Sequence, residues 1–212
     1  MMEFALVAPF LLAMLIGSFV LGLGMVKALQ AQQVNRNAGI LFMKYVDMSL
    51  ASNQEIVVRT AAGLNMTRTG GNGRVILSQV LRVGATECLA GGFTSTGACP
   101  NFDQYVFTKR IYFGNNGLTN SAGASLGSRL GNPRDGILQP DGGILINDFL
   151  TDPTARVNWF PMNMAYGEFC FVSETWFVMP ELYFPKWQLL IDPNPGNPTP
   201  YVDNSVYSIY LT

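Results

Sequence analysis

Residues 3–26 read EFALVAPFLLAMLIGSFVLGLGMV, and this stretch decides how the rest of the chain can be arranged. From Phe4 to Val26 it contains no charged residue. A helix of that length extends about 34 Å at 1.5 Å per residue, which is enough to cross a bilayer core of about 30 Å. Because the segment is apolar on every face, it predicts a helix that is surrounded by lipid or by other apolar helices.

Small residues interrupt this apolar segment. Pro9, Gly17, Gly22 and Gly24 would be costly inside the helix of a soluble protein, but apolar surroundings tolerate them. Small residues also let neighbouring helices approach closely. The segment is longer than the apolar core of a signal peptide and follows no basic stretch, so we expect it to be retained rather than cleaved off.

The chain becomes amphipathic after Lys27. Residues 28–50 contain no proline, and their apolar side chains recur every three or four residues, as on one face of a helix. The predicted stripe consists of Val34, Ala38, Leu41, Tyr45 and Met48. Residues 52–55 (SNQE) have the pattern of a capping box, so residues 1–65 form either one very long helix or a long helix and a short second one.

Further along, the period of the apolar residues changes from helical to alternating. Alternation predicts strands at 74–83, 104–113, 168–178 and, more weakly, 201–211, with 168–178 central in the sheet. We expect each of the first two strands to present one apolar face, formed by Val75, Leu77, Leu81 and Val83 and by Tyr105, Phe107, Ile111 and Phe113.

These patterns predict an α+β fold in which a long N-terminal helix (1–52) precedes a β-rich head (53–212). The helix divides into an apolar part (4–26) and an amphipathic part (27–52). The head contains an antiparallel sheet of about four strands and long loops. The longest loop, 114–165, is unusual for a compact domain, and such loops are typically functional or covered by a partner.

The chain has three cysteines, Cys88, Cys99 and Cys170. The segment between Cys88 and Cys99 is rich in Gly, Ser and Thr, which is typical of a loop that a disulfide closes in an oxidising compartment. The alternative is two reduced thiols in a cytosolic loop. Cys170 lies in an apolar run, where we expect a small buried thiol.

Composition excludes several classes of function. The chain contains no histidine, which removes the most frequent general base and metal ligand. Only 13% of the residues are charged, the net charge is −1, and no basic run is present, so we expect neither a nucleic-acid partner nor an enzyme.

The sequence also contains groups of carboxylates that we considered as calcium ligands or catalytic pairs. Asp135, Asp141, Asp148 and Asp152 lie among glycines and prolines, where oxygen ligands could hold calcium, but Asp-Gly turns explain them as well. Glu168 and Glu174 would be about 20 Å apart on one strand, too far for paired acid–base chemistry. We therefore expect ordinary charged strand positions.

Aromatic residues are concentrated in the last third of the chain. They predict the core of the head or, alternatively, an adhesive or subunit–subunit surface formed with the proline-rich stretch 192–200. The residues are Trp159, Phe160, Trp176, Phe177, Tyr183, Phe184, Trp187, Tyr201, Tyr207 and Tyr210.

The segment EFALVAPFLLAML (3–15) and the small residues that follow it to Gly24 resemble the N-terminus of TadE-like proteins. These are the minor pilins or pseudopilins of tight-adherence type IV pilus systems. The order of NQEIVVRTAAGL (53–64), VFTKRIYFGN (106–115) and GEFCFVSETWF (167–177) is also similar to that of longer TadE-like proteins.

The resemblance implies a subunit whose apolar helix waits in the inner membrane and then packs into a filament core. In the pilin superfamily, a glutamate near the mature N-terminus faces the N-terminal amine of a neighbour, and Glu3 matches it, followed by Phe4. A carboxylate among apolar helices is costly unless it is paired. The alternative is that Glu3 lies in the headgroup region.

Two features depart from the superfamily pattern. The glutamate is usually fifth after a leader-peptide cleavage, whereas here it is third. Lys27, Arg36 and Lys44 follow the apolar segment and would place the head in the cytoplasm by the positive-inside rule, which contradicts a disulfide. Removal of a basic leader would reconcile the two.

The sequence therefore predicts a structural subunit of an extracellular filament of the type IV pilus kind. Its partners would be copies of itself, the bacterial inner membrane before assembly and the pilus assembly machinery. It would need no cofactor. The assembly residues would be Glu3, Phe4, Pro9, Gly17, Gly22 and Gly24. The alternative is a monomeric, membrane-anchored binding module, such as an assembly factor or adhesin.

Overall fold

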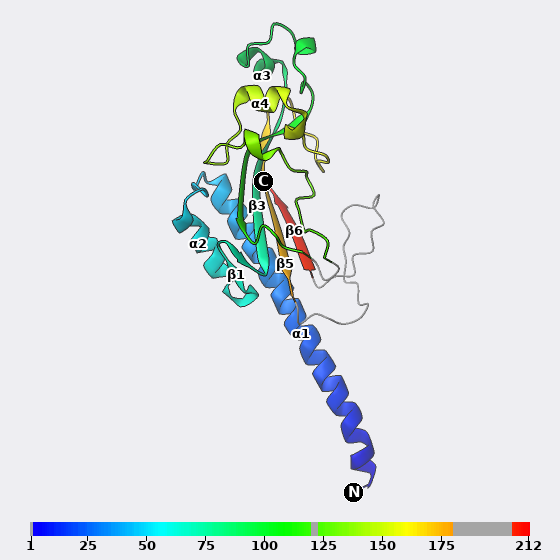
Figure 1. Ribbon diagram of the computed structural model, residues 1–212. Coiled ribbons are helices and arrows are strands. Elements are labelled where there is room, and N and C mark those ends of the chain that lie inside the picture. Colours follow the sequence, from blue (N-terminus) through cyan, green and yellow to red (C-terminus); the bar gives the residue numbers. More distant parts are fainter. Residues whose placement is uncertain (1, 120–122, 180–204) are drawn as a thin grey trace.

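The computed structural model describes residues 2–119, 123–179 and 205–212, except for the side chains of residues 2–9, 13, 20 and 21. A long helix leaves the head at one end, and the head is built around a four-stranded antiparallel sheet (Figure 1). The predicted α+β class with a four-stranded sheet is confirmed.

The long helix α1 (Met2–Met43) has two different halves. Its second half packs on the sheet, and its buried positions recur every three or four residues, as expected for one face of a helix. The fully or almost fully buried apolar side chains are Ala31, Val34, Ala38 and Phe42. Of the predicted stripe, Val34, Ala38 and Met48 are buried and Leu41 is partly buried, but Tyr45 is exposed. Phe42 is buried without having been predicted.

The helix α1 ends at Met43, earlier than the predicted boundary at residue 52. Tyr45 adopts a left-handed conformation with φ of 58°. The amide of Tyr45 donates to Phe42 O (3.0 Å) and that of Val46 to Leu41 O (3.1 Å), the two bonds of a Schellman motif. Periodicity alone could not reveal this stop because no glycine marks it.

The second helix, α2 (Ala51–Thr60), does not use the predicted capping box. Its N-cap is Leu50, which has no side-chain capping bond. The Asn53 side chain instead donates to Asp47 O (2.7 Å), and the Asp47 carboxylate accepts from the Ser49 amide (3.0 Å). The turn before the helix therefore satisfies these polar groups.

The four main strands pair in the order β4-β3-β5-β6, and every pairing is antiparallel. Strand β5 is interior, as predicted. Residues 201–204 of the predicted last strand lie outside the described residues. The bounds are β3 Gly73–Arg82, β4 Tyr105–Gly114, β5 Phe169–Val178 and β6 Ser205–Leu211.

A β-bulge in β4 overturns the prediction that its alternate residues share one face. Lys109 pairs with Gln79, but the next pair is Phe107 with Val80, so Thr108 is the extra residue. As a result Ile111 and Phe113 join the cluster on the α1 side, whereas Phe107 joins the other cluster. The bulge lets one strand supply apolar side chains to both sides of the sheet.

The predicted face of β3 is also divided. Val75 and Leu77 pack with α1, but Leu81 and Val83 belong to the second cluster, near the disulfide. A continuous alternation along the sequence therefore does not mean a single core. The strand is long enough to pass from one core to the other.

The long connection between β4 and β5 covers the sheet face opposite α1. Leu130, Ile144 and Leu150 of this connection pack in one cluster with Val80 and Val172 of the sheet. The connection also contains short helical turns: η3 (Asp135–Ile137), α4 (Ile146–Thr151) and η4 (Pro153–Ala155). The head is thus a three-layer arrangement of helix, sheet and structured loop.

The remaining short elements lie at two places in Figure 1. Helix α3 lies with α4 at the end of the head that is farthest from the N-terminus, and the ribbon of β1 and β2 lies beside α2. Their bounds are η1 Ala62–Leu64, β1 Met66–Thr67, β2 Gly70–Gly71, α3 Ala85–Ala90 and η2 Thr96–Ala98.

A disulfide joins Cys88 of α3 to Cys99, as predicted. It closes a loop with a sequence separation of 11 residues at the far end of the head. Cys170 is a free, buried thiol, also as predicted. Burial raises the pKa of the Cys170 thiol, so it stays protonated and behaves as a small apolar group.

Candidate functional site

The first half of α1 projects from the head without covering by other elements of the described chain (Figure 1). Its described large apolar side chains are exposed over most of the circumference of the helix, whereas Gly24 is buried, and the first fully buried side chain is that of Ala31. The exposed residues are Phe10, Leu11, Leu12, Met14, Leu15, Ile16, Phe19, Leu23, Met25, Val26 and Leu29. We call Phe10–Leu29 the free half of α1.

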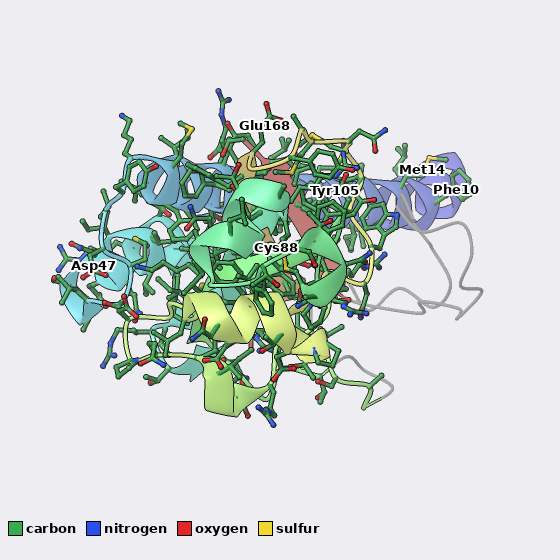
Figure 2. All side chains as sticks on the ribbon, turned by 90° about the horizontal axis from the view of Figure 1, so that it is seen from above. Phe10, Met14, Asp47, Cys88, Tyr105 and Glu168 are labelled. Carbon is green, nitrogen blue, oxygen red and sulfur yellow. A yellow bond between two sulfur atoms is a disulfide. The ribbon has the colours of Figure 1, made fainter. Side chains whose placement is uncertain are left out.

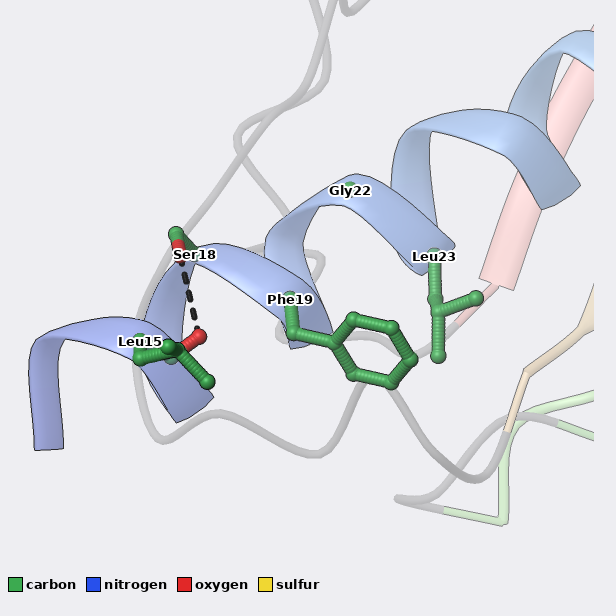
Figure 3. A pocket seen from close by; sticks show the side chains of 5 residues that line it. All are labelled: Leu15, Ser18, Phe19, Gly22 and Leu23. Carbon is green, nitrogen blue, oxygen red and sulfur yellow. Dashed lines mark hydrogen bonds between the residues drawn. The ribbon is translucent and has the colours of Figure 1, made fainter. Parts of the chain in front are cut away.

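The free half of α1 carries a shallow open groove of about 370 Å³ (Figure 3). Leu15, Phe19 and Leu23 line it with large apolar side chains, and the small residues Ser18 and Gly22 complete the lining. The Ser18 hydroxyl donates to Leu15 O (2.9 Å), so it needs no partner from outside. A Cβ added at Gly22 would meet nothing within 4 Å, which leaves room for a second helix to approach.

The predicted assembly residues all lie on this helix. The backbone of Glu3, Phe4 and Pro9 belongs to α1, but their side chains lie outside the described residues. A Cβ added at the half-buried Gly17 would also meet nothing within 4 Å. Gly24, in contrast, is buried, so the structure does not present it as an open contact position. The pairing expected for Glu3 stays a prediction.

Exposure on this scale sets a physical requirement. Soluble monomers rarely expose large continuous apolar surfaces, and such surfaces mark contacts with membranes or other proteins. Phe10–Met43 is long and apolar enough to span a membrane. In an aqueous compartment the free half of α1 must be covered by apolar groups from elsewhere.

A second constellation, which sequence reasoning missed, lies between the sheet and the long connection. Glu174 of β5 is fully buried and accepts hydrogen bonds from the backbone amide of Arg129 (2.9 Å), the hydroxyl of Tyr207 (2.8 Å) and the hydroxyl of Ser128. The guanidinium of Arg110, equally buried, lies 3.7 Å from the same carboxylate. We call these five residues the Glu174 network.

The electrostatics of the Glu174 network follow from its burial. Burial away from water lowers the pKa of Arg110, but the guanidinium of an arginine stays protonated in proteins. Its guanidinium also stacks over the ring of Phe107 at 4.3 Å. Burial, and then the neighbouring Glu174 carboxylate, raise the pKa of Tyr207, so its hydroxyl keeps the proton that it donates.

The Glu174 network has a structural role in the head. Its members come from β4, β5, β6 and the long connection, so one carboxylate ties together segments far apart in the sequence. The prediction that Glu174 is an ordinary charged strand position is wrong. The sequence contained one signal: Glu174 and Arg110 each lie in a three-residue polar stretch between apolar residues of a predicted strand, and a charge buried in a strand needs a partner.

Glu168 and the aspartates have local roles. Glu168 precedes β5, and its carboxylate accepts from the Ala165 amide (2.7 Å). Asp141 accepts from the Gly143 amide (2.9 Å) and lies 3.9 Å from Lys109 Nζ, while Asp135 and Asp148 lie on the separate elements η3 and α4. Within the described parts of the chain, no three acidic, Cys or His side chains come together around a metal-sized space.

The aromatic residues of the last third divide between core and surface. Trp176 and Phe177 are buried, whereas Trp159 remains partly exposed. Trp176 Nε1 donates to Gly127 O (2.9 Å), which fixes the long connection to β5. Predicted aromatic positions between 183 and 201 lie outside the described residues.

Comparison with known proteins gives no relative. The chain matches no protein-family model, no curated protein and no solved structure. Its function must therefore be argued from its own residues.

Proposed function

We propose that the protein is a structural subunit of an extracellular filament of the type IV pilus kind. The subunit is held in a membrane by the free half of α1 before assembly, and it is joined to copies of itself through that same segment afterwards. The observation that carries the proposal is the division of α1: one face of its second half packs in the core of the head, while its first half is apolar and its described large side chains are exposed.

The division of α1 favours two successive environments for one segment. A lipid bilayer satisfies an apolar helix without any specific contact. Packing among helices of other copies satisfies it equally, because small residues such as Gly17 and Gly22 permit close approach. Since α1 is one continuous helix, packing its free half fixes the position of the head relative to the assembly.

The disulfide supports an extracytoplasmic position of the head. Disulfides persist in oxidising compartments and are rare in the cytosol. The Cys88–Cys99 pair therefore opposes the orientation that Lys27, Arg36 and Lys44 suggest. We expect the head on the oxidising side of the membrane.

The test is electron microscopy of material sheared from cells that express the protein with its own assembly genes. We expect filaments that contain this chain. Leu15→Glu and Phe19→Glu place a charge in the free half of α1 and should abolish the filaments. Gln32→Glu changes an exposed polar position of the same helix and serves as the matched control.

A second candidate is a monomeric, membrane-anchored binding module, which the exposed apolar helix supports equally well. The same preparations separate the two. Detergent-solubilised monomers with no filaments in any sample would contradict the filament proposal and favour the anchored module.

A further inference from the structure

The sheet face that α1 covers is left open beyond the end of that helix. Along α1, Gly39 lies against Ser173, and Phe42 packs edge-on against Phe171 with ring centroids 5.4 Å apart. The next residue of β5 on this face is Phe169, which lies past the last turn of α1 and is 50% exposed. The face therefore continues where its helix has stopped.

Aromatic side chains make this open end one continuous surface. Tyr45, which is 73% exposed, and Phe169 both pack edge-on against Phe171, with centroids 5.6 Å and 5.8 Å away. A groove of about 500 Å³ borders Phe169 and has Met162 as part of its apolar wall. We call Tyr45, Met162, Phe169 and the underlying Phe171 the aromatic end patch.

The aromatic end patch lies on the α1 side of the head. Phe171 of the patch contacts Phe42 in the last turn of α1. Phe10 and Met14 lie at the other end of the same helix, which projects to one side when the molecule is seen from above (Figure 2). The free half of α1 and the aromatic end patch are thus two separate apolar surfaces near the two ends of α1.

A filament of identical copies needs two such surfaces. A head-to-tail contact joins two different patches, one from each copy, and repeats without closing when the operation is helical. The free half of α1 supplies one patch. The aromatic end patch matches it chemically, because the apolar stripe of α1 already covers this sheet face up to Phe42.

We propose that the aromatic end patch is the docking surface for a second copy of this chain, and that its occupant is the free half of that copy's α1. The inference rests on the proposed function and adds the complementary surface to it. An uncharged helix fits this position because residues 4–26 bring no charge that would be buried against Tyr45 and Phe169.

Two surface variants and a matched control test the docking surface. Tyr45→Glu and Phe169→Glu should reduce the amount of sheared filament by about tenfold or more, because each places a charge in an apolar contact. Ile56→Glu alters a half-exposed apolar residue of α2, outside the patch, and should leave the amount unchanged. Thermal unfolding in detergent checks that each head still folds.

Site-specific photocrosslinking gives a reading that does not depend on a variant's stability. Benzoylphenylalanine replaces Tyr45 in assembled filaments, and Ile56 in the control. We expect the crosslink from position 45, but not from position 56, to join a peptide within residues 10–29 of another copy.

The outcomes separate the two proposals. If wild type and all three variants form filaments equally, or if the crosslink from position 45 maps to lipid or to another peptide, the docking surface is wrong and the filament proposal stands. If the wild type forms no filaments, the proposed function is wrong and the docking surface fails with it.

Discussion

Glu174 shows what one buried charge demands of the residues around it. A carboxylate taken out of water is costly unless donors and an opposite charge replace the lost hydration. Here Tyr207, Arg129 and Ser128 donate to it, and Arg110 lies 3.7 Å away. Loss of the carboxylate would leave Arg110 as a buried charge with no carboxylate paired to it among the described residues.

We therefore expect Glu174→Ala to lower the free energy of unfolding by about 3–5 kcal/mol, the usual cost of removing one partner of a buried pair. Urea denaturation of the purified protein in detergent measures it. Glu55→Ala removes one member of an exposed pair with Arg59 and should change the free energy of unfolding by about 0.5 kcal/mol or less.

A double variant tests whether the cost is an unpaired charge. Arg110→Met combined with Glu174→Leu should recover part of the stability lost by Glu174→Ala, because no charge is then buried. A double variant as unstable as the sum of the single ones would show that the hydrogen bonds of Glu174, rather than the charge pair, carry the stability.

Asp103 gives a prediction for pH. Arg82 donates to Asp103 Oδ1 from Nη2 (2.8 Å) and Nε (3.2 Å), which holds the pKa of Asp103 below its ordinary value. A depressed carboxylate pKa contributes stability above the unfolded pKa of about 4, and this stability is lost as the pH falls through the folded pKa.

Asp103→Asn should therefore be less stable than wild type at neutral pH, and the difference should shrink below about pH 4. Thermal unfolding between pH 2 and 7 measures both proteins. A constant difference across this range would mean that the variant acts through packing and not through the charge of Asp103.

At the scale of elements, α1 and the sheet approach closely at one glycine. A Cβ added at Gly39 would lie 2.6 Å from Tyr210 Cδ1 and 3.3 Å from Ser173 Cβ. Beside this contact, Asn35 Nδ2 donates to the Ser208 hydroxyl (2.9 Å), so small and polar side chains line the seam between α1 and β5–β6. The helix lies where it does because these side chains are small.

We expect Gly39→Ala to destabilise the head by about 1–2 kcal/mol, even though alanine is the better helix former by about 1 kcal/mol. The matched control is Gly22→Ala, where the added methyl meets nothing and the head should keep its stability. Denaturant midpoints compare the two. A stabilised Gly39→Ala protein would show that Tyr210 moves aside at little cost.

At the scale of the whole molecule, the head and the free half of α1 are separable. The head's own buried clusters take their α1 residues from Ala31 onward. Deletion of residues 1–23 should therefore give a soluble monomer with an intact disulfide and a melting temperature within about 4 °C of wild type. Size-exclusion chromatography and calorimetry test this, and an aggregated or unfolded product would contradict it.

Patterns of neighbouring residues account for much of this architecture. The apolar helix, four strands, the interior place of β5 and the Cys88–Cys99 disulfide were predictable, because each depends on a local run of residues or a short loop. The end of α1 at Met43 was not predictable, since Tyr45 has no sequence mark of a left-handed residue.

By itself, the sequence determined that one end of this protein must be surrounded by apolar groups, since an uncharged helix between residues 4 and 26 has no polar face to give to water. Only the tertiary structure decided where the other polar and apolar groups go. It brought Arg110 to Glu174, divided β4 between two cores at Thr108, and left Phe169 and Tyr45 uncovered past the end of α1. The physical reason is that these outcomes depend on strand register and on where one helix stops over a sheet, and both are set by contacts between residues far apart in the chain.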